Sequence, residues 1–244
     1  MPDGTGPDAS RDVRGFDQLS ATVPAPLLLW FSPAFPVGGF AFSHGLEWAA
    51  ERGWIKNRET LAAWLTDLIA HGAIGNDQIL LCAAWRATMQ KDTAALREAI
   101  DLALALQPSA ERHLEAVTQG GAFMTQIEAS WPCAALPWFR TLHDGEIAYC
   151  TAVGVAAAGH GIALQSTLLP YALAVVGNLV SAAVRLGVVG QTDGQRVLAQ
   201  LLPEIERVSR ASLTATLADL GSACWRSDLA SLQHETQYTR LFRS

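Results

Sequence analysis

The sequence predicts an all-α protein, a single-domain helical bundle of about eight to ten helices with mobile N- and C-terminal tails. Apolar residues recur at helical spacing along most of the chain, whereas convincing strand alternation and hairpin signals are absent. No repeat or low-complexity tract divides the 244 residues, which are enough for one large core. We therefore expect a disordered tail over 1–23, an all-α domain over 24–225 and a C-terminal tail over 226–244.

The predicted helices follow one another, and several have a recognisable start or stop. The first strong pattern runs through Leu61, Leu65 and Leu68, beginning near Asn57 or Arg58 and ending at His71-Gly72. Trp131-Pro132 ends a later helix, because proline cannot continue the hydrogen-bond ladder. Gly159-His160-Gly161 resembles a glycine C-cap. Further helices are expected over residues 79–89, 93–106, 111–130 and 147–158.

The segment from Leu168 to Val189 is almost wholly apolar and about as long as a membrane span. Pro170, Asn178 and Arg185 interrupt it, and the last two would be costly in lipid. We therefore expect a buried or interface helix in a soluble protein, with no membrane partner. In the core, the two polar side chains would need hydrogen-bonding partners.

One more helix is expected after the glycines at 187 and 190. Thr192-Asp193-Gly194-Gln195 has the T-x-x-Q form of a capping box, and apolar residues continue to Val208. Pro203 is expected to kink this helix.

Composition excludes several classes of function. The net charge is −6, and no stretch concentrates Lys and Arg, so nucleic acid is not an expected partner. Only 16% of residues are charged, against about 25% in a typical soluble domain. Some apolar surface is therefore expected to meet another protein chain.

The cysteines and the N-terminus indicate a cytoplasmic protein. The four cysteines are widely spaced without a C-x-x-C pair, which favours reduced thiols. Residues 1–20 are polar and lack the apolar run of a signal peptide.

The sequence contains no complete motif of the kinds considered for binding a nucleotide or a metal ion. The chain has no G-x-x-x-x-G-K-[ST] motif and so no P-loop. His234-Glu235 opens like a zincin motif, but Tyr238 stands where the second histidine must be. The other histidines are scattered. We expect no metal ligands and no cofactor.

Ser43 raises the possibility of a serine hydrolase. Ala41-Phe42-Ser43-His44-Gly45 resembles a nucleophile elbow with alanine in the first place, and Asp144 and His160 could complete a triad. The alternative is that Ser43 caps a helix beginning near Gly45 or Leu46, with Glu47 in its first turn. We favour the cap, because nothing nearby is typical of an α/β sheet.

Two other segments are unusual. Residues 32–40 combine two prolines with Gly38-Gly39, and such a loop is either a connector over the core or a shaped recognition surface. Near the C-terminus, Tyr238, Leu241 and Phe242 lie among arginines. Aromatic residues and arginine dominate binding energy at interfaces, but packing of this segment on its own domain is an equal alternative.

These segments also carry a family resemblance. The run from Ser32 to Glu47, Ser-Pro-Ala-Phe-Pro-Val-Gly-Gly-Phe-Ala-Phe-Ser-His-Gly-Leu-Glu, is similar to the signature of urease accessory proteins of the UreF type. The blocks 182–187 and 190–195 and the ending Arg240-Leu241-Phe242-x-Ser244 resemble the same family. The resemblance extends from about Pro26 to Ser244.

The resemblance implies an all-α, often dimeric protein without catalytic activity. Members bridge the UreD-type (UreH) accessory protein and the GTPase UreG, and the assembly delivers nickel into apo-urease. Modulation of GTP hydrolysis by UreG and passage of nickel are two roles that the sequence leaves open. Any bound GTP would belong to UreG.

The resemblance also assigns partner-binding residues. The C-terminal group is expected to become ordered on binding the UreD-type partner, with Arg240 fixed by hydrogen bonds or a carboxylate pair. A second group would shape the surface towards UreG or urease, or would be purely structural. The two groups are Tyr238, Arg240, Leu241 and Phe242, and Pro36, Gly38, Gly39 and Glu47.

Overall fold

A computed structural model describes residues 23–244, so the expected tail over 1–23 lies almost entirely outside the described residues. The all-α fold is confirmed, since every regular element in the described part is a helix. Nine of its α-helices have eight residues or more, and α1 and α2 have six each. The helices are α1 (Ala25–Trp30), α2 (Leu46–Glu51), α3 (Arg58–His71), α4 (Ala73–Gln90), α5 (Thr93–Ala105), α6 (Ala110–Ser130), α7 (Ala135–Leu142), α8 (Tyr149–Gly159), α9 (Leu164–Arg185), α10 (Gln191–Ser212) and α11 (Trp225–His234), with 3-10 turns η2 (Gly39–Ala41) and η3 (Leu217–Asp219).

Local sequence patterns predicted some helix ends correctly and others incorrectly. The Asn57 side chain accepts the Thr60 N–H at 3.0 Å and caps α3, as expected. In contrast, α10 begins at Gln191 after Gly190, so Thr192 lies within the first turn and forms no capping box. The extended backbone of Gly190 starts the helix before the threonine can cap it.

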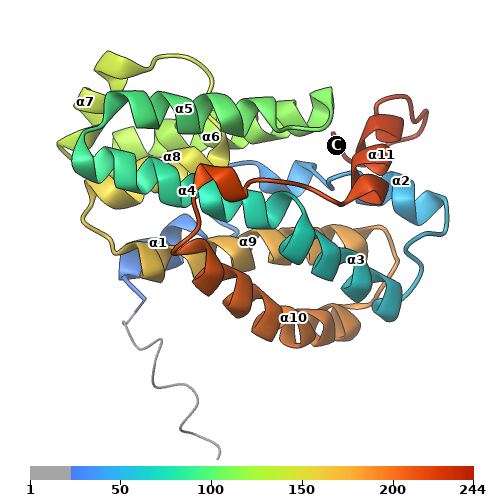
Figure 1. Ribbon diagram of the computed structural model, residues 1–244. Coiled ribbons are helices and arrows are strands. Elements are labelled where there is room, and N and C mark those ends of the chain that lie inside the picture. The colour runs from blue at the N-terminus through green and yellow to red at the C-terminus, as the bar shows by residue number, and fades with distance from the viewer. Residues whose placement is uncertain (1–22) are drawn as a thin grey trace, which may run out of the picture.

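Helix α8 lies at the centre of the bundle. Ten of its eleven residues are buried, which explains why it is apolar on every face. Small residues allow a close approach to α4: a Cβ on Gly154 would lie 2.6 Å from the Leu81 carbonyl oxygen. Figure 1 shows α5, α6 and α7 on one side of this centre and α3, α9 and α10 on the other.

Helix α9 is the apolar helix that the sequence singled out. Among the described residues it is the one helix long and apolar enough to cross a membrane, and half of its most apolar stretch is buried inside the protein. The Asn178 amide donates to the Gly39 carbonyl at 2.8 Å, and the Arg185 guanidinium stacks 4.3 Å from the centre of the Phe242 ring. Both polar side chains therefore have partners within the fold.

The core has two parts that meet along α9. One lies among α1 and α4–α8, and the other among α2, α3, α9, α10 and α11. Helix α11 and the C-terminus lie beside α2, at the end of the molecule furthest from α7 (Figure 1).

The C-terminal segment differs from the expected mobile tail. Residues 225–234 form α11, and the chain then turns back so that Phe242 and Ser244 are buried. The structure therefore has the alternative that the sequence left open: this segment packs on its own domain. The physical reason is a set of buried carboxylates that satisfy the segment's backbone and side-chain donors, described next.

Candidate functional site

Glu47, in the first turn of α2, holds the C-terminal segment by its backbone. Its carboxylate accepts the N–H of Leu241 at 2.7 Å and the N–H of Phe242 at 2.9 Å. The same side chain lies 3.2 Å from Nε2 of the fully buried His234. Hydrogen bonds to a charged acceptor are stronger than neutral ones, so this buried carboxylate fixes the path of the segment.

Glu111, at the start of α6, is a second anchor. One oxygen lies 2.6 Å from His234 Nδ1, and the other accepts from Arg240 Nη1 at 2.6 Å. The carboxylate pair expected for Arg240 is thus formed within the chain.

Glu115, one helical turn further along α6, receives the end of the chain. Its carboxylate accepts from the Ser244 hydroxyl at 2.9 Å, lies 2.8 Å from His44 Nε2, and is bonded to Arg112. Ser244 is completely buried, and its carbonyl accepts the Ser43 N–H at 2.7 Å. Burial alone would raise the pKa of Glu115, but the Arg112 guanidinium, His44 and the Ser244 hydroxyl outweigh it and lower the pKa to about 2.

Gly45 allows α11 to approach closely. It has φ +73°, and a Cβ there would lie 2.6 Å from the Ser231 nitrogen. Ser231 in turn shares a hydrogen bond with Ser109, the N-cap of α6. The turn at 43–45 is therefore shaped to receive both α11 and the chain end.

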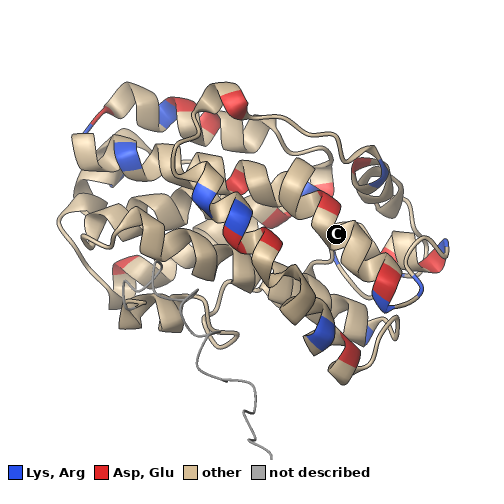
Figure 2. Ribbon diagram, turned by 60° about the horizontal axis from the view of Figure 1, so that its bottom comes forward, with Lys and Arg blue, Asp and Glu red and all other residues tan. Residues whose placement is uncertain are grey.

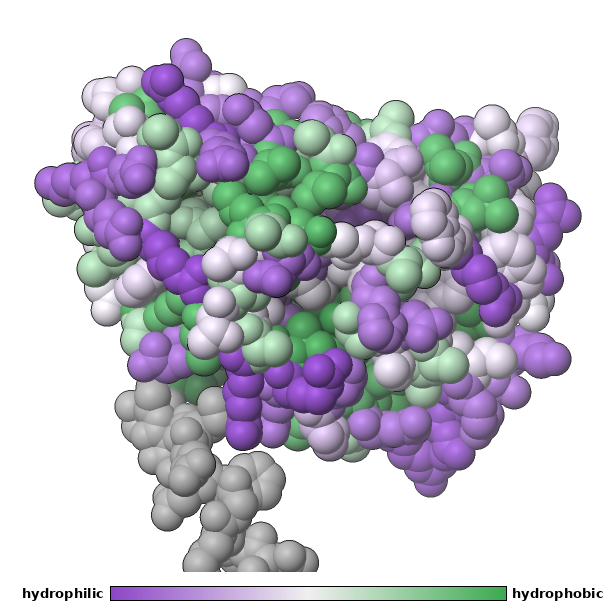
Figure 3. Space-filling view, in the orientation of Figure 1, coloured by the Kyte–Doolittle hydropathy of each residue, from purple (hydrophilic) through white to green (hydrophobic). Residues whose placement is uncertain are grey.

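The outer face of this same region is apolar. Tyr238 is fully exposed and Leu241 is 63% exposed, although the neighbouring Phe242 is buried and the partly exposed Arg240 is tied to Glu111. Trp225, Leu229 and Leu232 are exposed at spacings of four and three residues, which places them on one outer face of α11. Figure 3 shows apolar surface over α11. The segment thus has an inward anchoring face and an outward apolar face.

The expected partner-binding residues fall into two places. Glu47 joins Tyr238, Arg240, Leu241 and Phe242 in the region just described. Pro36, Gly38 and Gly39 instead line a cavity that adjoins this region at Glu115, and Gly38 has φ +74°. Sequence reasoning missed Glu111 and Glu115 as anchors. Their spacing of four residues on α6 was visible, but nothing local linked them to a segment more than a hundred residues away.

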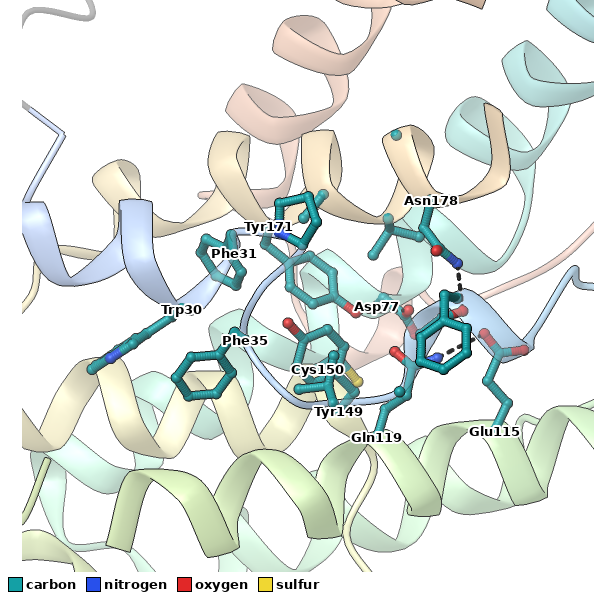
Figure 4. Close-up of a pocket in the computed structure, with 18 of the residues that line it drawn as sticks. Trp30, Phe31, Phe35, Asp77, Glu115, Gln119, Tyr149, Cys150, Tyr171 and Asn178 are labelled. Carbon is teal, nitrogen blue, oxygen red and sulfur yellow. Dashed lines mark hydrogen bonds between the residues drawn. The ribbon is translucent and has the colours of Figure 1, made fainter. Parts of the chain in front are cut away.

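The cavity beside the 32–40 loop measures about 720 Å³. Its aromatic wall contains Trp30, Phe31, Phe35, Tyr149 and Tyr171, and Figure 4 shows these rings together at one end. At the other end lie polar side chains from three helices, namely Asp77 of α4, Glu115 and Gln119 of α6, and Asn178 of α9.

The geometry does not support a serine nucleophile. The Ser43 hydroxyl donates to the Ser244 carbonyl and lies 3.4 Å from the Glu47 N–H. His160 is occupied elsewhere, with its ring nitrogens near the backbone oxygens of Ala156 and Trp131. No strand occurs over residues 23–244, so the α/β framework of that elbow is lacking there. The expected cap is also corrected, because Gly45 is the N-cap of α2.

In the described part of the chain, neither the charge distribution nor the metal-ligating side chains indicate a further functional site. Basic and acidic residues alternate over the helices without a basic stripe (Figure 2). No group of three or more His, Cys, Asp or Glu side chains within residues 23–244 is placed to hold a metal ion.

Comparisons with known proteins place the chain in a family. The family model described as UreF matches residues 55–202. The urease accessory protein UreF of Rhodopseudomonas palustris (strain BisA53) is 47% identical over the whole of both chains. Those of Xanthobacter autotrophicus and Methylorubrum populi are 50% and 49% identical, over 90% and 89% of this chain and 90% and 97% of theirs. The chain therefore belongs to the UreF family of urease accessory proteins, which are not enzymes.

Proposed function

We propose that this chain is a scaffold in urease maturation, which bridges a UreD-type (UreH) protein and the GTPase UreG so that nickel is delivered into apo-urease. Family membership and the relatives' name, urease accessory protein, support this role. The observation that carries it is the C-terminal region, where a firmly anchored segment presents an exposed apolar face. The setting proposed is the cytoplasm, and the protein would act as a homodimer.

The UreD-type partner is assigned to the outer face of α11 and the C-terminal segment. Tyr238 and Leu241 would be the central contacts, because both are exposed on a backbone that Glu47 holds in place. A preformed surface loses less conformational entropy on binding than a disordered one. Arg240 and Phe242 would act as positioning residues for this face.

The loop containing Pro36, Gly38 and Gly39 is assigned to UreG or urease. Phe40, at the end of this loop, is 71% exposed, which suits a protein contact. The loop adjoins the C-terminal segment, because the Arg243 N–H donates to the Ala41 carbonyl at 2.8 Å, so the two partners would lie next to each other on the scaffold.

Co-purification tests the proposal. The full chain is expected to recover both UreD-type and UreG proteins, and deletion of residues 240–244 to lose the UreD-type protein. Circular dichroism of the deletion variant must show retained helix, because Phe242 and Ser244 are buried. Failure of the full chain to recover either partner would overturn the scaffold role.

A further inference from the structure

The cavity beside the 32–40 loop has a polar end that is rich in hydrogen-bond acceptors. Tyr171 donates its hydroxyl to Asp77 at 2.9 Å, so the carboxylate lies at the cavity wall with capacity for further donors. Gln119 and Asn178 use their amide nitrogens to donate to Glu115 and to the Gly39 carbonyl. Their side-chain oxygens therefore remain as acceptors, and that of Gln119 lies next to Gly39.

His44 adds an acceptor that has no partner. Its side chain is buried, its Nε2 faces the Glu115 carboxylate at 2.8 Å, and its Nδ1 has no hydrogen-bond partner among the described residues. Burial and the Arg112 charge lower the pKa of His44, which favours the neutral ring. Because a carboxylate only accepts, Nε2 carries the proton, and the Nδ1 lone pair is buried without a partner in the described part of the chain.

His44 is also held in a costly backbone conformation. Its φ is 56°, which few residues other than glycine adopt. Such strain persists where the surrounding structure fixes it, and it is concentrated at functional sites. His44 is therefore a strained and buried residue in the lining of the cavity.

Charge and size narrow the class of ligand. Glu115 is paired with Arg112, so Asp77 is the acidic group at the polar end without a cationic partner among the described residues; burial raises its pKa, and a bound cation would offset that cost. The aromatic wall suits an apolar body and also favours a cation near the ring faces. The volume of about 720 Å³ is that of a small-molecule site rather than of a single inserted side chain. The described residues contain no metal-holding cluster.

We propose that this cavity binds a small organic cation, an amine or amidinium group on an aromatic or branched apolar body. The cationic head would lie at Asp77 and Gln119 and donate hydrogen bonds to both. The body would lie between Phe31, Phe35 and Tyr149. The inference is independent of the scaffold role.

Calorimetric titration of the full chain tests the proposal with arylalkylamines from benzylamine to 4-phenylbutylamine. The matching alcohols and carboxylates serve as neutral and anionic controls. At least one amine is expected to bind about tenfold or more tightly than its alcohol, and the carboxylate not to bind. Equal binding of amine and alcohol, preference for the carboxylate, or no binding by any amine would overturn it.

Two variants locate the binding. Asp77→Asn keeps the Tyr171 hydrogen bond but removes the charge, and it is expected to abolish the preference for amine; Asp101→Asn on the exposed face of α5 is its control. Gly177→Leu fills the cavity, since a Cβ at Gly177 meets no described atom within 4 Å, and it is expected to abolish binding. Gly121→Leu, equally open on α6 but outside the cavity, is expected to bind normally. Unchanged amine binding in Gly177→Leu would contradict the assignment.

Discussion

The Glu47 carboxylate accepts the backbone N–H of Phe242 at 2.9 Å, across 195 residues of chain. This bond joins the motif at the start of α2 to the C-terminal segment, so the two most distinctive parts of the sequence form one structural unit. Phe242 is then enclosed beneath the Arg185 guanidinium. The outward position of Leu241 is a direct consequence, because its neighbour is fixed inward.

Replacing Glu47 by glutamine should loosen the C-terminal segment. The amide keeps one acceptor but brings an N–H₂ group towards donors, so we expect a loss of about 1–3 kcal/mol in the free energy of unfolding. Amide hydrogen exchange should become faster at Leu241 and Phe242 in particular. Retained protection at both amides would contradict the anchoring role.

Gly45→Ala should destabilise the contact between α2 and α11. Alanine adds about 1 kcal/mol of strain at φ +73° and places its Cβ against the Ser231 backbone. Gly53→Ala is the matched control, because Gly53 has φ +70° but open space among the described atoms. Thermal unfolding should show a clearly larger loss for Gly45→Ala, and equal losses would show that the close approach is unimportant.

Acid should destabilise the protein in two steps. The pKa of His44 is lowered in the folded state, so below its ordinary value of 6.5 the unfolded chain takes up the proton first and stability falls. The pKa of Glu115 is about 2 instead of 4.5, so its contribution, on the order of 3 kcal/mol, is present above pH 4.5 and lost towards pH 2. Urea unfolding as a function of pH measures both steps. The His44→Gln variant should lack the first step, and an unchanged pH profile would argue against it.

The four cysteines, all free in the structure, should differ sharply in reactivity. Burial raises the pKa of Cys82 to about 12 and that of Cys150 well above its usual range, where the Asp77 carboxylate contributes. Cys133 is only half-buried. A thiol reagent at pH 8 should therefore modify Cys133 first in the native protein. Peptide mass mapping checks the order, and rapid modification of Cys82 would contradict the burial described.

Local patterns in the sequence were sufficient for most of the longer helices, but not for α1, α7 and α11 or for the long-range contacts. Asn57 and Trp131-Pro132 marked helix ends because capping and proline chemistry act within a few residues. The sequence left the role of the C-terminal segment open for a physical reason. Aromatic and apolar residues such as Tyr238, Leu241 and Phe242 suit an interface with a partner as well as they suit a protein core. Only the fold brings Glu47, Glu111 and Glu115 to the same place. The orphaned Nδ1 of His44 likewise depends on a tertiary contact with Glu115 that no local spacing encodes.

The central claim is that the outward face of the C-terminal segment binds the UreD-type protein. The most direct measurement is the affinity of that protein for the double variant Tyr238→Ala/Leu241→Ala, whose anchoring residues are intact. The control is Leu28→Ala/Leu29→Ala on α1, where the side chains are 63% and 54% exposed. We predict that the Tyr238→Ala/Leu241→Ala variant binds the UreD-type protein about tenfold or more weakly, and that the control binds it with wild-type affinity. Both variants are expected to unfold at the wild-type stability. Wild-type affinity of the Tyr238→Ala/Leu241→Ala variant would contradict the account.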